Sequence, residues 1–335
     1  MTRLRWIIQV VSFVTILYGG FAVQEGSRLL DEVRGGHPAP SRALPENLKW
    51  VEKRTTVTTL HLPATSCIYQ RQGLCRGCSL YYLSDVITWL KPLGVILPSL
   101  TLLLLLMLLG GRLWCGWVCP LGFLSDLLTQ LRAWTGIAQV RVSRRARDGL
   151  LWAKYALLFF SLGIAALAAL PSLAEHRLSL LDPFCQICPS RLIAAFFTFD
   201  RLCWTNFRDA ITMSFMVLGW LAFALFFVGL TVRRFWCRLC PIGGLSALFN
   251  KTGMVMLVKN KELCTRCGTC ARVCPLDIDR VHEDGGRPEV TAYECHLCLR
   301  CVDACPERGC LAFRWLGKRA AGSGGWQGRI AGIDP

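Results

Sequence analysis

Cys264-Thr-Arg-Cys267-Gly-Thr-Cys270-Ala-Arg-Val-Cys274-Pro275 is repeated in pattern as Cys295-His-Leu-Cys298-Leu-Arg-Cys301-Val-Asp-Ala-Cys305-Pro306. In a run with this spacing, three thiolates hold one iron-sulfur cube and the fourth reaches the neighbouring cube. The two runs therefore predict two 4Fe-4S clusters. The ligands expected for the first are Cys264, Cys267, Cys270 and Cys305, and those expected for the second are Cys274, Cys295, Cys298 and Cys301. A zinc ribbon would instead need two C-x2-C pairs, not two four-cysteine runs that each precede a proline.

The segment around the two runs has the signals of a small folded module. Residues 283–287 read Glu-Asp-Gly-Gly-Arg, which indicates a turn, and residues 290–293 suit a short strand. We expect residues 256–317 to form an α+β dicluster ferredoxin domain and residues 318–335 to be a flexible tail. Cys310 lies outside both runs and is predicted to be a packed thiol.

The rest of the chain has the composition of a membrane protein. Of the 335 residues 53% are apolar and 12 are tryptophan, which excludes a disordered chain and an ordinary water-soluble globule. Four apolar runs are each about long enough to cross a bilayer, namely residues 6–23, 93–109, 150–173 and 211–232. We therefore expect residues 1–255 to form a membrane α-helical domain with four transmembrane helices. Lys154, the one charge inside these runs, is expected to reach the lipid headgroups.

The charges of the chain bear on its partners and its orientation. A formal net charge of +16 does not indicate a nucleic-acid partner, because each cluster with its four thiolates carries about −2. Basic residues follow the second and fourth apolar runs, and the cysteine-rich tail needs a reducing compartment. Four crossings then place both termini in the cytoplasm, at a bacterial inner membrane. The basic residues are Arg132, Arg141, Arg144, Arg145, Arg147, Arg233, Arg234 and Arg238.

An internal repeat divides the membrane part into two halves. Arg112-Leu-Trp-Cys115-Gly-Trp-Val-Cys119-Pro120 aligns with Arg234-Phe-Trp-Cys237-Arg-Leu-Cys240-Pro241, and each copy follows an apolar run. In a fainter pairing, Cys75-Arg-Gly-Cys78 precedes the second run and Cys185-Gln-Ile-Cys188 precedes the fourth. We therefore expect two duplicated halves. In duplicated membrane proteins the functional site often lies at the interface between the halves.

The cysteines of the repeat form two candidate sets. Cys115, Cys119, Cys237 and Cys240 would face the cytosol, where they can hold a further cluster, hold a zinc ion or remain as two reduced pairs. On the exported side, Cys75, Cys78, Cys185 and Cys188 can hold another cluster, or form disulfides with Cys67 and Cys203 as further partners. Covalent c-type haem is excluded, because neither C-x2-C pair is followed by histidine.

Proton-linked chemistry has one candidate site. Glu175 and His176 stand at the outer end of the third apolar run, where they can receive a proton from a quinol. The alternative is an ordinary solvated loop. None of the five histidines has a partner four residues away inside an apolar run, so a two-haem cytochrome b core has no ligands.

From about Leu93 to Phe313 the chain resembles the NapH and MauN type of ferredoxin-like membrane proteins, and it shares parts of its arrangement with NosR and CcoG. The resemblance rests on the two inner motifs and on the eight tail cysteines. It implies that the cysteines of these motifs are the functional residues of this chain. It implies a membrane electron carrier that takes electrons from quinol toward an exported reductase through partner iron-sulfur and cytochrome subunits. The outer C-x2-C pairs and the long first loop depart from the NapH pattern, and no flavin-binding domain precedes the spans as in a complete NosR-like protein.

The function expected is that of an electron-transfer subunit, a quinol dehydrogenase-type component. It would couple the quinone pool, or a cytosolic donor, to a partner redox enzyme. One alternative is an assembly or maturation factor that reduces a metal ion or a disulfide for another enzyme. Another is a structural membrane anchor, which would not need the tail cysteines.

Overall fold

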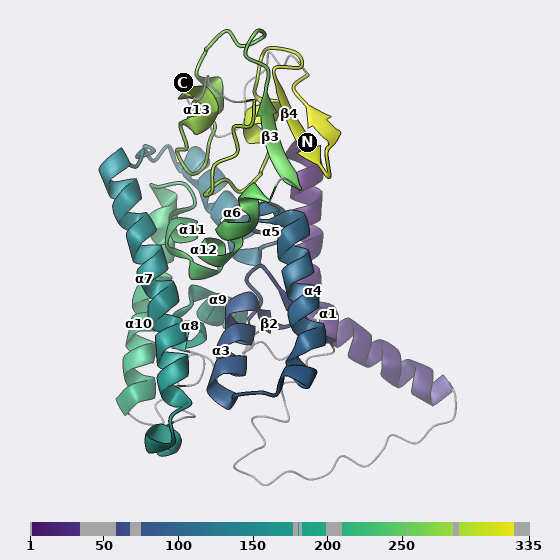
Figure 1. Cartoon of the computed structure of the whole chain (residues 1–335), viewed down its shortest axis with the longest axis vertical. Helices are drawn as coiled ribbons and strands as arrows, with labels where there is room; N and C mark the ends of the chain where they lie inside the picture. The colour runs from purple at the N-terminus through teal and green to yellow at the C-terminus, as the bar shows by residue number, and fades with distance from the viewer. Residues whose placement is uncertain are drawn as a thin grey trace. The chain divides into compact units, whose positions relative to one another are not determined.

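The computed structural model is largely helical and describes residues 2–33, 58–67, 75–176, 180, 183–198, 210–252, 254–283 and 288–324 (Figure 1). The chain divides into two compact units, each built from separated segments. The first unit consists of Met1–Val10, Leu100–Phe160 and Ala224–Pro335. The second unit consists of Val11–Ser99 and Ser161–Phe223.

Four long helices contain the apolar runs. They are α1 (Thr2–Val33), α4 (Leu93–Gly110), α7 (Arg144–Ala168) and α10 (Ala210–Phe226), which the 3-10 helix η4 (Phe227–Leu230) continues. Within the described residues, two helical stretches are long and apolar enough to cross a membrane, Arg144–Ala168 and Ala210–Leu230; a shorter apolar helix spans Ile96–Gly110. These helices indicate a membrane protein. That α1 and α4 also cross the membrane stays a prediction.

The repeat folds in the same way in both copies within the first unit. A short helix, α5 (Leu113–Trp117) or α11 (Phe235–Leu239), carries the first cysteine of each pair. The second cysteine caps a new helix, α6 (Pro120–Thr135) or α12 (Pro241–Ala247), whose first turn contains the proline. Proline suits this position because its ring presets the helical φ and its missing N–H has no partner there in any case. The 3-10 helix η5 (Leu248–Lys251) follows α12.

The tail of the first unit contains an antiparallel sheet of β3 (Val255–Lys259), β4 (Leu311–Trp315) and β5 (Lys318–Gly322), in that order. Val255 pairs with Trp315 and Lys259 with Leu311. The predicted flexible tail from residue 318 therefore begins with a strand, and residues 325–335 lie outside the described residues. Three one-turn helices complete the tail: α13 (Thr269–Arg272), α14 (Arg280–Glu283) and α15 (Arg300–Asp303).

The two cysteine runs of the tail share an unusual backbone. The residues on either side of the second cysteine have positive φ in both runs: 55° and 73° at Arg266 and Gly268, and 50° and 60° at Leu297 and Leu299. A side chain other than glycine rarely adopts this conformation, because its Cβ approaches the backbone oxygen. Because both runs have the same strained backbone, each run is expected to be bent around the same kind of bound group.

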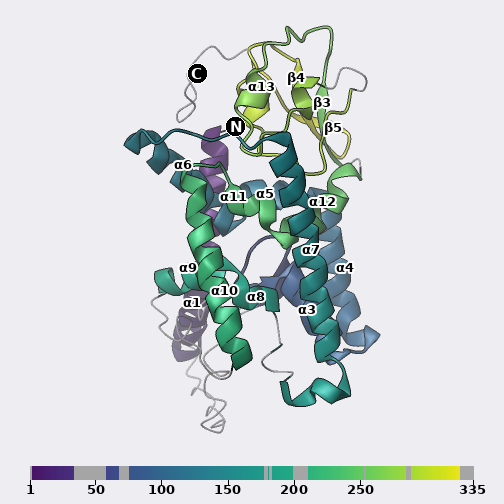
Figure 2. The ribbon, with the colours of Figure 1, turned by 90° about the vertical axis from the view of Figure 1, so that its left-hand side faces the viewer.

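The tail core extends into the first motif of the repeat. Trp117 of α5 packs with buried residues of β3, β4 and the second cysteine run, which include Val255, Leu257, Leu297 and Phe313. Figure 2 shows β3, β4 and α13 next to α5 and α11. The first copy of the repeat and the tail therefore belong to one packed body.

The second unit contains the outer cysteines. Strands β1 (Thr58–Leu62) and β2 (Cys75–Cys78) pair in parallel, and β2 leads directly into α3 (Ser79–Trp89). Three short helices follow in the chain: the 3-10 helix η2 (Pro171–His176), α8 (Pro183–Ile187) and α9 (Pro189–Thr198). Cys203 and the side chain of Cys75 lie outside the described residues.

Candidate functional site

The tail cysteines surround two hollows. One is lined by Cys264, Cys267, Cys270 and Cys305, with Cys310 beside them. The other is lined by Cys274, Cys295, Cys298 and Cys301, with Cys270 at its border. Each hollow thus brings together one complete set of the ligands expected from the run spacing, including the cysteine that comes from the opposite run. Four soft sulfur donors around a hollow fit an iron-sulfur cube.

Burial favours the protonated form of two thiols in the second hollow, Cys274 and Cys295. Burial raises the pKa of Cys274 to about 11 and that of Cys295 to about 12, and the neighbouring Cys298 adds to both. A metal must displace these protons, and metal binding is therefore coupled to their release. No three Cys, His, Asp or Glu side chains of the described residues are placed to hold one metal ion. A cube, by contrast, offers a separate iron to each thiolate and so needs them farther apart.

The four inner cysteines come together between the two copies of the repeat. Cys115, Cys119, Cys237 and Cys240 are all buried. Burial, together with Cys119 and Cys237, raises the pKa of Cys115 to about 12 against the opposing effect of Arg112 and Arg234. Burial also raises the pKa of Cys240, with contributions from all three other thiols. The four thiols therefore lie close enough to act on one another.

Two fully buried arginines, Arg112 and Arg234, lie beside these thiols at equivalent positions of the repeat. Nη2 of Arg112 donates to the carbonyl of Cys237 at 3.5 Å, and Nη1 of Arg234 donates to the carbonyl of Cys115 at 3.3 Å. Each arginine thus reaches across to the other copy. The sequence interpretation used Arg234 only as a topology signal, because burial cannot be read from a basic residue at the end of an apolar run.

His296 of the second tail run lies between the two arginines. Its Nε2 is 3.0 Å from Nη2 of Arg112, and its Nδ1 is 3.0 Å from Nη1 of Arg234. Burial and the two guanidinium groups hold the pKa of His296 well below 6.5, so the ring is neutral. This residue links the tail to both halves of the repeat, and spacing rules for cysteine runs say nothing of it.

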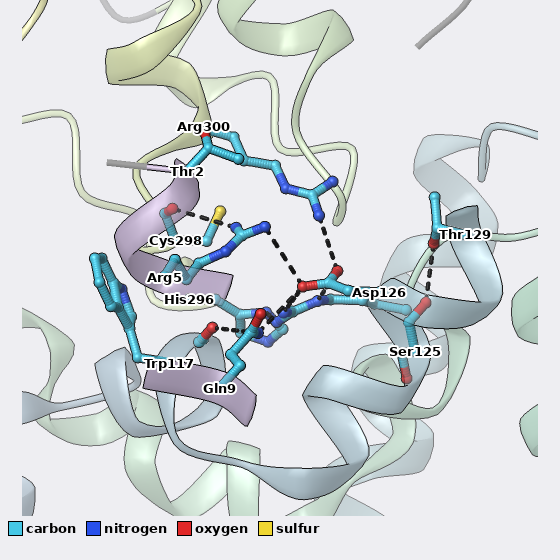
Figure 3. A network of polar contacts seen from close by, with 12 residues as sticks. Thr2, Arg5, Gln9, Trp117, Ser125, Asp126, Thr129, His296, Cys298 and Arg300 are labelled. Atoms are coloured by element: carbon cyan, nitrogen blue, oxygen red, sulfur yellow. Dashed lines mark hydrogen bonds and ion pairs between the residues drawn. The ribbon is translucent and has the colours of Figure 1, made fainter. Parts of the chain in front are cut away.

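Asp126 of α6 is the centre of a buried ionic network (Figure 3). Its carboxylate accepts hydrogen bonds from Nε and Nη2 of Arg234 at 3.0 and 2.7 Å, and from Nη2 of Arg300 at 3.0 Å. Nη2 of Arg5 lies 3.5 Å away, and Gln9 donates at 3.2 Å. Burial alone would raise the pKa of Asp126, but Arg234, Arg300 and Arg5 outweigh it and hold this pKa well below its usual range.

Asp126 was not predicted from the sequence. The available signal was a difference between the two copies, because Ser125-Asp126 aligns with Ser246-Ala247. A lone carboxylate in an otherwise apolar helix is a candidate for a buried ion pair.

A second buried ionic pair joins α7 to the tail. Nη1 of Arg112 lies 2.6 Å from the carboxylate of Glu294, and Nζ of Lys154 contacts the same carboxylate. Burial would raise the pKa of Glu294, but Arg112 and Lys154 together lower it. The expectation that Lys154 reaches the lipid headgroups is therefore wrong, since its side chain is only 1% exposed. Helical spacing could not reveal a partner that is 140 residues away.

The loop of the first inner motif lies directly against the second tail run. A Cβ at Gly116 would lie 2.5 Å from the carbonyl oxygen of His296 and 3.6 Å from Cα of Cys298. The indole of Trp117 donates to the carbonyl of Leu297 at 3.0 Å. Glycine at position 116 is required because no side chain fits between these two backbones.

The second unit contains the described outer cysteines. Cys67, Cys78 and Cys188 are buried and Cys185 is half-buried. A hydrogen bond from Cys185 lowers the pKa of Cys78. The other candidate residues of this unit, Glu175 and His176, are exposed at the end of η2.

Two family descriptions match the chain. A 4Fe-4S binding domain matches residues 92–137 and 213–262, which contain the two inner motifs, and a 4Fe-4S dicluster domain matches residues 256–306. No solved structure matches the chain significantly.

Similar proteins include three ferredoxin-type or regulatory proteins. The chain is 32% identical over 214 residues to the regulatory protein NosR of Pseudomonas aeruginosa, covering 60% of this chain and 25% of NosR. It is 29% identical over 232 residues to the methylamine utilization ferredoxin-type protein MauN of Methylorubrum extorquens, covering 67% of this chain and 69% of MauN. It is 29% identical over 224 residues to the ferredoxin-type protein NapH of Escherichia coli, covering 64% of this chain and 67% of NapH.

The matched regions include both inner motifs and both tail runs, which are the residues that carried the resemblance seen in the sequence. The match spans only a quarter of the NosR chain. The chain is therefore similar to ferredoxin-type proteins of the NapH and MauN type and to NosR, and it contains segments that match 4Fe-4S binding and dicluster domains.

Proposed function

We propose that this protein is a membrane-bound electron-transfer subunit that passes single electrons between the quinone pool, or a cytosolic donor, and a partner redox enzyme. The observation that carries the proposal is the direct contact of the inner cysteine loop with the second tail run at Gly116 and Trp117. This contact places the three four-cysteine sets of the first unit in one packed body. Electron exchange needs such closeness, whereas a structural anchor does not.

The residues that would hold the clusters are those of the three sets. In the tail they are Cys264, Cys267, Cys270 and Cys305 for one cluster, and Cys274, Cys295, Cys298 and Cys301 for the other. In the inner set they are Cys115, Cys119, Cys237 and Cys240. Bound clusters would supply one-electron exchange at potentials that their charge, hydrogen bonds and burial set. The surrounding chain excludes water from the inner set and leaves Cys267 of the tail exposed.

The proposal includes an arrangement in the membrane. Residues 1–255 form the membrane domain, with four spans in two duplicated halves and both termini in the cytoplasm, and residues 256–317 form the ferredoxin domain. The apolar helices α7 and α10 and the repeated helix starts at Pro120 and Pro241 support it. Quinone binding and an exported partner are part of the proposal because NapH-type proteins suggest them.

A second candidate function is the maturation of a partner enzyme by reduction of a metal ion or a disulfide. The hydrogen bond between Cys78 and Cys185 favours it, because two neighbouring cysteine sulfurs can take part in thiol–disulfide exchange. The same thiols, with Cys75 and Cys188, can instead hold a cluster. Iron content separates these two possibilities.

We expect about twelve iron and twelve acid-labile sulfide per chain in protein purified without oxygen, at four of each per cube. About eight would confine the clusters to the tail and contradict the inner one. About sixteen would place a further cluster at the outer cysteines and count against the maturation function. Iron-free protein that still supports its partner would refute electron transfer.

Replacing Cys237 by serine should remove about four iron per chain and abolish one spectroscopic signal, because serine does not replace a thiolate ligand well. The signals of the two tail clusters should remain. The matched control is Cys310→Ser, since Cys310 is a buried thiol beside the first tail hollow and not among the inner thiols, so the inner signal should remain in this variant. Unchanged iron in the Cys237 variant would show that the inner set binds no cluster.

A further inference from the structure

The two buried arginines of the repeat form a symmetrical pair around the inner cysteines. Arg112 and Arg234 each precede the first cysteine of their copy by three residues. Each donates to the carbonyl of the first cysteine in the opposite copy. Each also passes close to the glycine two residues beyond the proline of that opposite copy. A Cβ at Gly243 would lie 2.8 Å from Nη2 of Arg112, and a Cβ at Gly122 would lie 3.7 Å from Nη1 of Arg234.

The charge of both arginines acts on the inner thiols. Arg112 interacts electrostatically with Cys115, Cys237 and Cys240, and Arg234 interacts with Cys115 and Cys237. Nε of Arg112 is buried and has no hydrogen-bond partner among the described residues. An arginine with a spare donor beside four thiols is suited to bind an anion.

The carboxylates nearby do not balance the buried positive charge. In the ionic network of the described residues, Arg5, Arg234 and Arg300 share Asp126, while Arg112 and Lys154 share Glu294. Five cations thus face two carboxylates. Unbalanced charge in a buried site is strongly unfavourable, so an anionic group is needed there.

A cube with four thiolates would meet that need. Four irons of average charge +2.5, four sulfides and four thiolates sum to about −2. Two such groups, one at the inner set and one at the second tail set, would more than offset the surplus of the network. A cluster bound by these cysteines would therefore explain the excess of buried cations, which membrane orientation alone does not explain.

We propose that Arg112 and Arg234 form a cationic clamp that neutralises the anionic cluster at the inner cysteines and favours its reduced form. The inference rests on the proposed function. Reduction adds one negative charge to the site, and both arginines keep their positive charge in either oxidation state. Two buried cations next to the thiolates therefore stabilise the reduced form more than the oxidised form.

The experiment is a redox titration of purified protein, followed by electron paramagnetic resonance, together with iron analysis. We compare Arg112→Gln and Arg234→Gln with Arg112→Lys and Arg234→Lys. Each glutamine variant should shift the reduction equilibrium of the inner cluster at least tenfold toward the oxidised form, which corresponds to 59 mV for a one-electron couple. If the cluster is lost instead, the inner signal and about four iron per chain should disappear. Each lysine variant should restore the signal and most of the potential. The matched control is Arg144→Gln, since Arg144 is two-thirds exposed.

The outcomes separate the clamp from the proposed function. An inner signal in the unsubstituted protein supports the inner cluster whatever the variants do. Its absence, with about eight iron per chain, would overturn the clamp but leave electron transfer through the two tail clusters standing. An unchanged potential with full iron in the glutamine variants would overturn the clamp alone. Lysine variants as damaged as the glutamine variants would also overturn it, because shape and hydrogen bonding would then matter and not charge.

Discussion

Replacing Asp126 by alanine is expected to lower the free energy of unfolding by about 3–5 kcal/mol. Asp126 is 1% exposed and is the shared partner of Arg5, Arg234 and Arg300. Removing the carboxylate leaves these guanidinium groups buried without a counter-charge. The loss should be measured as a fall in the thermal unfolding midpoint of the detergent-solubilised protein, kept free of oxygen.

The matched control for this substitution is Asp279→Ala. Asp279 also contacts two arginines, Arg144 and Arg147, but it is about one-third exposed, so its removal should cost no more than about 1 kcal/mol. Equal destabilisation by the two substitutions would mean that the Asp126 network contributes no more than a surface ion pair.

The lowered pKa of Asp126 also predicts the direction of a pH effect. The ionised form is favoured in the folded protein, so the network contributes its full stability above the ordinary carboxyl pKa of 3.8. This contribution is lost as the pH falls below that value and through the lowered folded pKa. The Asp126→Ala variant should lack this part of the acid sensitivity.

Replacing Gly116 by alanine is expected to destabilise the first unit by about 1–3 kcal/mol, because the added methyl group has no space. Its Cβ would lie 2.5 Å from the carbonyl oxygen of His296. Either α5 or the second tail run must then move, and the magnetic interaction between the inner signal and the nearer tail signal should weaken. Thermal unfolding and electron paramagnetic resonance of the reduced protein measure the two effects.

Gly149→Ala is the matched control for the Gly116 substitution. Gly149 lies in α7 with nothing within 4 Å of an added Cβ, so alanine there should leave stability unchanged or raise it slightly. If Gly116→Ala behaved like Gly149→Ala, the inner loop and the tail would not be held in contact.

Short-range patterns were sufficient for several features. The spacing of the two tail runs predicted which cysteines surround each hollow, because three close ligands and one distant ligand follow from the geometry of a cube. The aligned Cys-Pro pairs of the repeat were seen in the sequence, and in both copies the structure begins a helix at that proline.

Features that depend on distant partners could not be predicted. Nothing in the sequence near Lys154 or Glu294 shows that they meet, and His296 is hidden inside a cysteine run whose spacing explains the thiols alone. Trp117 follows an apolar run, where a tryptophan also suits a membrane interface, whereas in the structure it is part of the tail core. Amphipathic rings suit both places, so the residue type could not separate them.

The contact between Arg5 and the Cys298 carbonyl joins residues 293 positions apart. Arg5 can therefore reach this partner only after residue 298 has been synthesised. Closure of so long a loop carries a large entropic cost, and contacts of such high sequence separation form slowly. The packing of the first turns of α1 against the second tail run is therefore expected to be among the later steps in the folding of the first unit.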